Sequence, residues 1–173
     1  MKKIYVIVIM AAFMSLAGKA NAQVSVHAGY QNSALRDSFL SIKYNGFYAG
    51  GNYNIGIANN LGVAPGLYFS YASCNLLGES LKEMDLRVPI LANYSIDVNR
   101  DICAFGFGGP VLGVNLVSDM EVRRFDLGLM FGAGIKYQNI SVELGYNIGL
   151  LNRYDDDDRV TMNSFVVGLG YSF

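Results

Sequence analysis

Few side chains in this chain could carry out acid–base or nucleophilic chemistry. His27 is the only histidine among the 173 residues. The chain therefore offers no histidine cluster for zinc, and a Ser–His–acid triad would have to be assembled around this one residue. No Ser and acidic residue pair convincingly with His27, and neither a G-x-G-x-x-G nor a Walker A run occurs. We therefore expect no enzyme activity, no cofactor and no metal centre, and we interpret His27 as a polar residue that lines an interior.

The most acidic segment, Asp155–Asp158, places four carboxylates next to one another. Carboxylate oxygens of this kind could bind calcium or bridge to other divalent ions. The run fails the EF-hand pattern, because Arg159 stands where a ligand is required and Val160 stands where the glycine is required. Arg153 and Arg159 flank the run and can neutralise it, which favours a solvated loop tip. Whether this loop binds divalent ions stays open.

Lys136 and Glu143 are the opposite charges most suited to an ion pair, and Arg87 and Asp126 are further candidates for the same interior network. In a protein interior, such charges are expected to be matched whatever their role. Their function would then be solvation and pairing, or a gate in a narrow pore. The choice depends on the elements that position them.

The composition of the chain favours β-structure. Hydrophobic residues make up 52% of the chain, which argues against disorder, and 20 Gly accompany 12 Tyr and 10 Phe. Gly weakens helices, whereas aromatic residues favour strands. The formal net charge is -1, and without Lys2, Lys3 and Lys19 it becomes 10 basic minus 14 acidic residues, or -4. No basic excess remains to bind nucleic acid.

Residues 1–22 are predicted to be a cleaved signal peptide. Lys2 and Lys3 form a basic start, Ile4 to Leu16 is apolar apart from Ser15, and Ala20-Asn21-Ala22 supplies a cleavage site. A membrane anchor is the alternative, but the apolar stretch is shorter than the roughly 18 to 20 residues that a spanning helix needs. The expected mature domain is 23–173.

Alternation of apolar with small or polar residues predicts eight strands. In the clearest one, Phe125–Tyr137, the odd positions are large and apolar and the even positions are small or polar. A two-residue turn at Gln138-Asn139 would place Tyr137 opposite Ile140 and Ile135 opposite Val142. The other predicted strands are Val24–Tyr30, Phe47–Ile57, Leu61–Tyr71, Met84–Ile96, Cys103–Val114, Ile140–Leu150 and Phe165–Phe173.

Short turns alternate with long polar connections, expected over Ser33–Lys43, Ala72–Glu83, Asn115–Arg124 and Asn152–Asn163. The predicted inner faces carry small and polar residues, whereas the outer faces carry Leu, Ile, Val, Phe and Tyr. Large apolar rows would overfill the interior of eight strands, so lipid is their better partner. We therefore predict an all-β fold, an eight-stranded antiparallel up-and-down transmembrane β-barrel in outer-membrane lipid. A secreted β-sandwich is the alternative.

Two cysteines invite the prediction of a disulfide in an exported protein. In the predicted topology Cys74 lies at the end with the long loops and Cys103 at the end with the short turns. A bridge tolerates Cα separations of only about 7 Å. We therefore expect two free thiols.

The chain resembles the PorT-like outer membrane β-barrel family over essentially the whole of 23–173. The resemblance rests on the runs Leu86–Tyr94, Gly108–Gly113, Phe125–Gly128, Gly132–Gly134 and Leu144–Tyr146. It implies an eight-stranded barrel in a bacterial outer membrane, commonly described as porin-like. One branch of that family assists protein secretion, and no residue here identifies that branch.

The C-terminal segment resembles the signal by which the barrel assembly machinery recognises its clients. Gly168, Tyr171 and Phe173 match its spacing, while Val166 departs from the polar residue usual at that position. The resemblance implies the assembly machinery as a partner during biogenesis.

Three functions remain open at this stage. The first is an integral outer-membrane protein, porin-like by family but without a wide pore, that acts through its extracellular loops or as an envelope component. The second is a narrow gated pore for ions or small solutes. The third is a subunit of a protein secretion or envelope-assembly complex, with a partner still to be identified.

Overall fold

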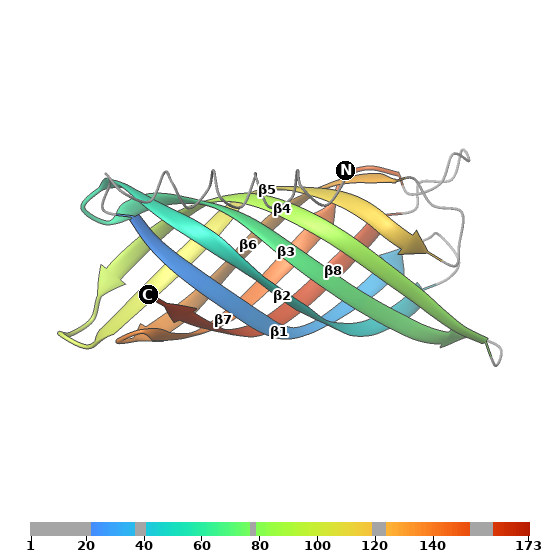
Figure 1. Ribbon diagram of the computed structural model, residues 1–173, viewed down its shortest axis with the longest axis horizontal. Helices are drawn as coiled ribbons and strands as arrows, with labels where there is room; N and C mark the ends of the chain where they lie inside the picture. The colour runs from blue at the N-terminus through green and yellow to red at the C-terminus, as the bar shows by residue number, and fades with distance from the viewer. Residues whose placement is uncertain (1–21, 37–40, 77–78, 119–123, 153–160) are drawn as a thin grey trace, which may run out of the picture.

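The computed structural model describes residues 22–36, 41–76, 79–118, 124–152 and 161–173. In these residues every strand pairs antiparallel with its neighbours in the sequence, and the last strand pairs with the first, so that a closed barrel forms (Figure 1). The strands are β1 (Ala22–Arg36), β2 (Ser41–Ala58), β3 (Leu61–Leu76), β4 (Glu79–Asp97), β5 (Ile102–Ser118), β6 (Phe125–Tyr137), β7 (Ile140–Gly149) and β8 (Thr161–Ser172). The predicted eight-stranded antiparallel barrel is confirmed.

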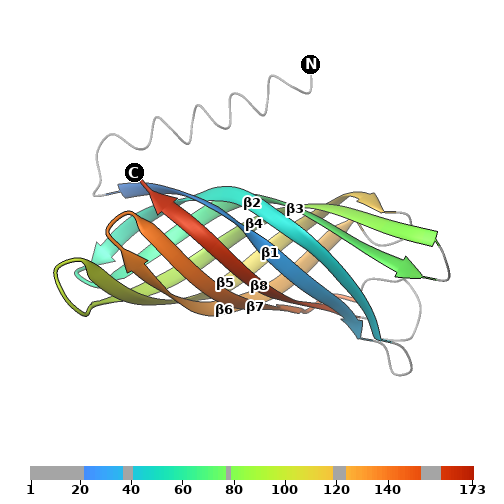
Figure 2. The ribbon, with the colours of Figure 1, turned by 90° about the horizontal axis from the view of Figure 1, so that it is seen from below.

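The two ends of the barrel differ. The β2–β3, β4–β5 and β6–β7 connections and the C-terminus lie at one end, called the turn end here (left in Figures 1 and 2). The opposite end is called the loop end. In outer-membrane barrels the short turns face the periplasm and the longer loops face outward. No helix in the described part of the chain is long and apolar enough to cross a membrane.

The β6–β7 hairpin has the register that the alternation predicts. Tyr137 pairs with Ile140, and Ile135 pairs with Val142. Gln138 takes the first turn position with φ of 53°, in the left-handed region, as tight hairpin turns require. Because the side-chain period of a strand is two, this register sends the whole apolar row to the outer face.

The strands extend beyond their predicted ends at the loop end. β1 continues to Arg36 and β2 begins at Ser41, so most of the segment expected to be a polar loop between them is paired strand. The same holds for β3 and β4, whose pairing continues to Leu76 and Glu79. In these extensions the buried residues Tyr44, Ala72 and Cys74 lie on the inner face, so the sequence lacks the outward apolar row from which the strands were predicted.

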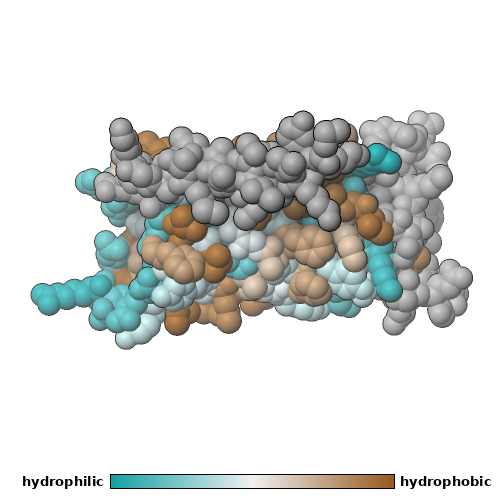
Figure 3. Space-filling view, viewed as in Figure 1, coloured by the Kyte–Doolittle hydropathy of each residue, from teal (hydrophilic) through white to brown (hydrophobic). Residues whose placement is uncertain are grey.

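Large apolar side chains cover the outer face of the barrel. Phe131, Ile135, Leu144 and Leu169 are all exposed by 48% or more. Figure 3 shows hydrophobic side chains gathered over the middle of the visible face, with hydrophilic residues toward its ends. Such a surface matches the apolar band of a membrane barrel.

The interior is less polar than the sequence suggested, because β5 turns two aromatic rings inward. Phe105 and Phe107 stack with their ring centroids 6.2 Å apart. A Cβ at Gly132 would collide with the ring of Phe107, and one at Gly134 would collide with the ring of Phe105. The glycines on the inner face of β6 therefore make the space in which these rings lie.

Both cysteines carry free thiols, in agreement with the prediction. In the strand register Cys74 lies opposite Leu81 of β4 near the loop end, and Cys103 lies opposite Lys136 of β6 at the turn end. The two cysteines therefore lie at opposite ends of the barrel.

Candidate functional site in the barrel lumen

A layer of polar side chains crosses the middle of the lumen. Its centre is Glu143 on β7, whose Oε1 accepts a hydrogen bond of 2.9 Å from the hydroxyl of Tyr48 on β2. Oε2 of the same carboxylate lies 3.2 Å from Nδ1 of His27 on β1. The side chains of His27 and Glu143 are only 8% and 10% exposed. Three strands are thus joined across the lumen by one buried carboxylate.

Gly168 on β8 lets this layer form. A Cβ at Gly168 would collide with the hydroxyl of Tyr48, and the next nearest atom is Cζ of the same ring at 2.9 Å. Gly168 also belongs to the C-terminal spacing that resembles an assembly signal. The structure gives this residue a second property, because it makes room for a ring that reaches across from β2.

Lys136 and Glu143 do not pair with each other. Lys136 Nζ donates a 2.9 Å hydrogen bond to Oε1 of Gln23 on β1. Lys136 lies opposite Ser141, two residues nearer the turn end than Glu143, which itself lies opposite Gly134. The long lysine side chain therefore reaches the hydrated turn end, while Glu143 is already satisfied by His27 and Tyr48.

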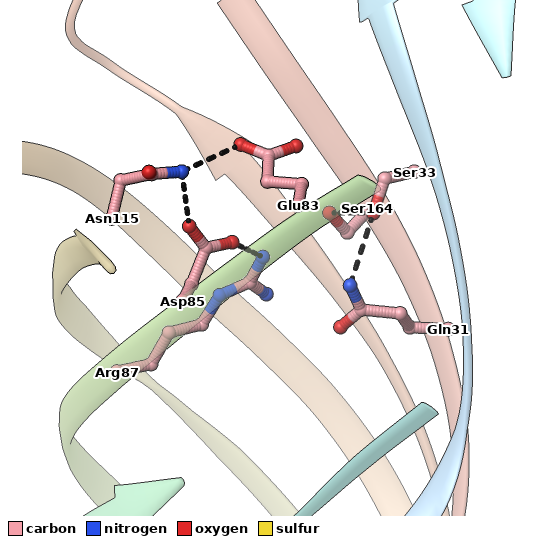
Figure 4. A network of polar contacts seen from close by, with 7 residues as sticks. All are labelled: Gln31, Ser33, Glu83, Asp85, Arg87, Asn115 and Ser164. Carbon is pink, nitrogen blue, oxygen red and sulfur yellow. Dashed lines mark hydrogen bonds and ion pairs between the residues drawn. The ribbon is translucent and has the colours of Figure 1, made fainter. Parts of the chain in front are cut away.

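A second charged group lies toward the loop end, on β4 and β5 (Figure 4). Arg87 contacts Asp85 at 3.3 Å, and Nδ2 of Asn115 donates to both Asp85 and Glu83, at 3.0 and 3.1 Å. Glu83 and Asp85 are 4% and 7% exposed. Arg87 thus pairs with Asp85, and Asp126 lies opposite Gly113 on the next strand pair.

Hydroxyl and amide groups of β1 and β8 lie across the lumen from this group (Figure 4). Ser33 and Ser164 join their hydroxyls at 2.8 Å, and Gln31 lies within 3.5 Å of Ser33. None of these three side chains is more than 1% exposed.

An apolar cluster fills the lumen at the loop end. Tyr44, Ala72 and Met162 are each 3% exposed, Cys74 is 8% exposed, and Leu81 packs against them. These side chains come from β2, β3, β4 and β8. Together with the polar layers below it, this cluster closes the lumen toward the loop end.

The space that remains lies in the middle and at the turn end. A cavity of about 100 Å³ in mid-lumen is bordered by His27, Tyr48, Phe105 and Glu143, among others. A second cavity of about 350 Å³ opens at the turn end, and we call it the vestibule. The two cavities share five lining residues: His27, Asn52, Ala64, Asn93 and Phe105. Both of these cavities therefore lie on the turn side of the apolar cluster.

The remaining predicted residues are placed as follows. Tyr171 and Phe173 lie on the outer face, 45% and 71% exposed, with their rings 5.1 Å apart. Asp155–Asp158 and residues 1–21 fall outside the described part of the chain, and β1 begins at Ala22. No group of three or more His, Cys, Asp or Glu that could hold a metal ion occurs within the residues that the structure describes.

Several lumen residues were missed by the sequence analysis, among them Tyr48, Tyr68 and Gln31. One signal could have found Tyr48, since it shares the parity of the polar residues Asn52 and Asn54 along β2, and polar residues of the strands were predicted to face inward. Its partner across the barrel could not be inferred this way, because strand parity gives the face of a residue and not its contacts through the lumen.

Comparison with known proteins agrees with this architecture. The family described as outer membrane protein beta-barrel domain matches residues 4–173. No curated protein matches the chain. Among solved structures, Neisserial surface protein A is similar with a TM-score of 0.63 at 15% identity, covering 88% of this chain and 99% of that one. The outer membrane enzyme PagL is similar with a TM-score of 0.56 at 13% identity, covering 86% and 98%.

The attachment invasion locus protein Ail of Yersinia pestis is similar with a TM-score of 0.50 at 20% identity, covering 88% of this chain and 99% of that one. At these identities the likeness concerns the fold alone. The family match spans almost the whole sequence, and its described residues form a closed eight-stranded barrel with an apolar outer face. The chain therefore belongs to the outer membrane protein β-barrel domain family, as a small eight-stranded member.

Proposed function

We propose that this protein is a closed barrel of the bacterial outer membrane, which acts through its extracellular loops or as an envelope component and not as an open channel. The observation that carries the proposal is the apolar cluster of Tyr44, Ala72, Cys74, Met162 and Leu81 at the loop end. An eight-stranded barrel has an interior just wide enough for side chains to fill. Here the filling is apolar at one end and hydrogen-bonded in the middle.

Planar-bilayer recording tests the closed state. Wild-type protein should show no unitary conductance steps. The double variant Tyr44→Ala/Met162→Ala should produce them, because it removes the two largest buried side chains of the cluster. The matched control is Tyr137→Ala/Leu169→Ala, which truncates side chains of similar size on the outer face. Steady conductance by the wild type would contradict the proposal.

A narrow gated pore is the second candidate. It is favoured by the mid-lumen cavity and the vestibule, which share lining residues and lie on the turn side of the apolar cluster. In that case the wild type would be silent at rest and would open in steps under voltage, whereas a closed barrel would stay silent throughout the voltage range.

A third role, as a subunit of a protein secretion or envelope-assembly complex, is suggested by the one branch of the PorT-like family that assists secretion. Crosslinking in cells followed by purification of the barrel tests it. A partner recovered at constant ratio to the barrel, and lost when residues 153–160 are replaced by a Gly/Ser segment, would favour this role. Export by a cleaved signal peptide belongs to the same proposal, and N-terminal sequencing should then begin at Gln23.

The proposal includes the absence of enzyme activity, which the geometry around His27 supports. Nδ1 faces the Glu143 carboxylate, and Nε2 has no hydrogen-bond partner among the described residues. A serine nucleophile would have to place its hydroxyl at Nε2. Incubation of the purified barrel with phospholipid or lipopolysaccharide should leave both unchanged by mass spectrometry.

A further inference from the structure

The vestibule at the turn end has the size and lining of a ligand site. Its volume of about 350 Å³ falls within the range of small-molecule pockets, roughly 300 to 1,000 Å³. Amide and hydroxyl side chains from several strands face it: Gln23, Ser25, Asn52, Asn54, Asn93 and Ser141. As the short turns of such barrels face the periplasm, the vestibule opens to that compartment.

The amides of the vestibule use only part of their hydrogen-bonding capacity on one another. Nδ2 of Asn93 donates to Oδ1 of Asn54 at 3.0 Å, and Nδ2 of Asn52 donates to the hydroxyl of Tyr68 at 3.2 Å. Within the described residues, this leaves the Asn54 amide NH₂ as a donor, and Oδ1 of Asn93 and of Asn52 as acceptors. A hydroxyl can both donate and accept, whereas a carboxylate only accepts and an ammonium only donates. The array therefore matches a ligand that carries several hydroxyls.

His27 presents its imidazole at the floor of the vestibule. Its side chain is 8% exposed and borders both the vestibule and the mid-lumen cavity. Nδ1 lies 3.2 Å from Oε2 of Glu143, but neither ring nitrogen has a hydrogen-bond partner in the described part of the chain. Buried polar atoms of this kind call for a hydrogen-bonding group from an occupant, and a hydroxyl can serve as donor or acceptor.

The charges at the vestibule balance. Lys136 and Arg100 are matched in number by Asp97 and Asp101, and Lys136 is already bonded to Gln23. The lining therefore favours neither an anion nor a cation. Phe105 supplies an apolar surface on which the carbon face of a ligand can rest.

The mid-lumen cavity sets the inner limit of the site. Its volume of about 100 Å³ is smaller than the roughly 150 Å³ that accommodates a benzene ring. It does have room for about three waters, at roughly 30 Å³ each. Gln31, Ser70 and Asn147 line this cavity, and each has a buried side-chain oxygen without a hydrogen-bond partner among the described residues, which waters can satisfy. The body of a ligand must therefore stay in the vestibule.

We propose that the vestibule binds a neutral sugar, a monosaccharide or disaccharide, from the periplasmic side. The amides of Asn52, Asn54 and Asn93 and the imidazole of His27 hydrogen-bond to its hydroxyls, and Phe105 contacts its carbon face. The site is independent of conductance, because it lies on the turn side of the cluster that closes the barrel.

Cys103 lines the vestibule and provides a reporter of occupancy. Protein purified from membranes in lauryldimethylamine oxide, a detergent without a sugar headgroup, is treated with a small methanethiosulfonate reagent. Glucose, N-acetylglucosamine or maltose is added in separate titrations. At least one of them should slow the modification of Cys103 about fivefold or more, saturably at millimolar concentration. Glucuronate and glucosamine, which have similar size but carry a charge, should protect at least tenfold less well.

The double variant Asn54→Ala/Asn93→Ala should raise the sugar concentration needed for half protection at least tenfold. Asn45→Ala is the matched control, because Asn45 is an exposed amide on the outer face of the same strand as Asn54. In this variant the sugar should protect Cys103 at the same concentration as in the wild type. The heat-dependent shift in gel mobility reports that each variant is folded. If the double variant does not fold, isothermal titration calorimetry of the wild type with the same five compounds tests the proposal, and at least one neutral sugar should bind more tightly than both charged analogues. The proposal is overturned if no neutral sugar protects saturably, if the charged analogues protect equally, or if the folded double variant binds like the wild type.

Discussion

The hydroxyl of Tyr48 on β2 donates a hydrogen bond of 2.9 Å to Glu143 on β7, across the middle of the lumen. This contact links strands that are not neighbours in the sheet, so backbone pairing does not enforce it. It also gives a buried carboxylate one of its two partners, the other being His27. The barrel wall is held by the ladder of backbone hydrogen bonds, whereas this contact fixes the contents of the lumen.

Removal of the Tyr48 hydroxyl should destabilise the folded barrel. Tyr48→Phe leaves the ring in place but leaves Oε1 of Glu143 without its donor, which typically costs about 1 to 3 kcal/mol. Urea unfolding in lipid vesicles measures the loss in the free energy of unfolding. Tyr137→Phe, a change on the outer face, is the control and should have little effect. Equal stability of Tyr48→Phe and wild type would mean that the hydrogen bond contributes nothing net.

Gly168 and Tyr48 should be energetically coupled. Gly168→Ala places a methyl group against the Tyr48 hydroxyl, and overpacking of this kind typically costs about 1 to 3 kcal/mol. In the Tyr48→Phe background part of that collision is removed, so the cost of Gly168→Ala should be smaller. A double-mutant cycle on unfolding free energies gives the coupling, and strictly additive effects would contradict it.

How far the sequence predicts this protein can be judged from the β6–β7 hairpin and the lumen. The hairpin was predicted residue by residue, because large apolar side chains alternate strictly and a tight turn fixes the register. Lys136 and Glu143 were assigned to the correct face but to the wrong partners. Their contacts depend on which side chains face each other across the lumen after the barrel closes. Strand alternation gives the face on which a residue lies, but not its partner across the lumen.

The strand lengths show a second limit. Inside the membrane band one face must be apolar, so the pattern is visible in the sequence. Beyond it, pairs such as Ser73 with Lys82 continue the ladder with polar residues on both strands. Such segments look like loops in the sequence because their apolar residues, such as Tyr44 and Ala72, face the lumen, and the outward apolar row of the membrane band is missing.

The glycines of β6 should tolerate no side chain on the inner face. Gly132→Ala and Gly134→Ala would press a methyl group into the rings of Phe107 and Phe105, each with an expected cost of about 1 to 3 kcal/mol. Ala133→Gly, on the lipid-facing side of the same strand, should cost less, about 0.5 to 1 kcal/mol. Midpoints of urea unfolding compare the three variants. A larger loss for Ala133→Gly than for either inner variant would contradict the packing of the rings against glycine.

The two thiols should differ in reactivity. Cys74 is 8% exposed within the apolar cluster at the loop end, whereas Cys103 borders the vestibule. Without added sugar, Cys103 should react with a water-soluble thiol reagent in the folded barrel, and Cys74 only after unfolding. Mass spectrometry of labelled peptides makes the comparison. Non-reducing peptide mapping should recover no Cys74–Cys103 bridge, and finding one in the folded monomer would contradict the topology.

The C-terminal aromatics should matter more for assembly than for the stability of the finished barrel. Tyr171 and Phe173 are 45% and 71% exposed on the outer face, so a folded barrel packs little protein against them. Full burial of such a side chain contributes only roughly 1.5 to 3 kcal/mol. Assembly differs, because β8 must pair with β1 before the sheet has no open edge, and unpaired backbone groups cannot be satisfied in lipid.

If the assembly machinery recognises these residues, Tyr171→Ala/Phe173→Ala should lower the amount of barrel in the outer membrane of cells. The purified variant should still refold into detergent with near-normal yield. Tyr137→Ala, an aromatic truncation on the outer face near the same end, is the control and should assemble normally in cells. Equal losses of the double variant in cells and in detergent would mean that packing, and not recognition, accounts for the terminal aromatics.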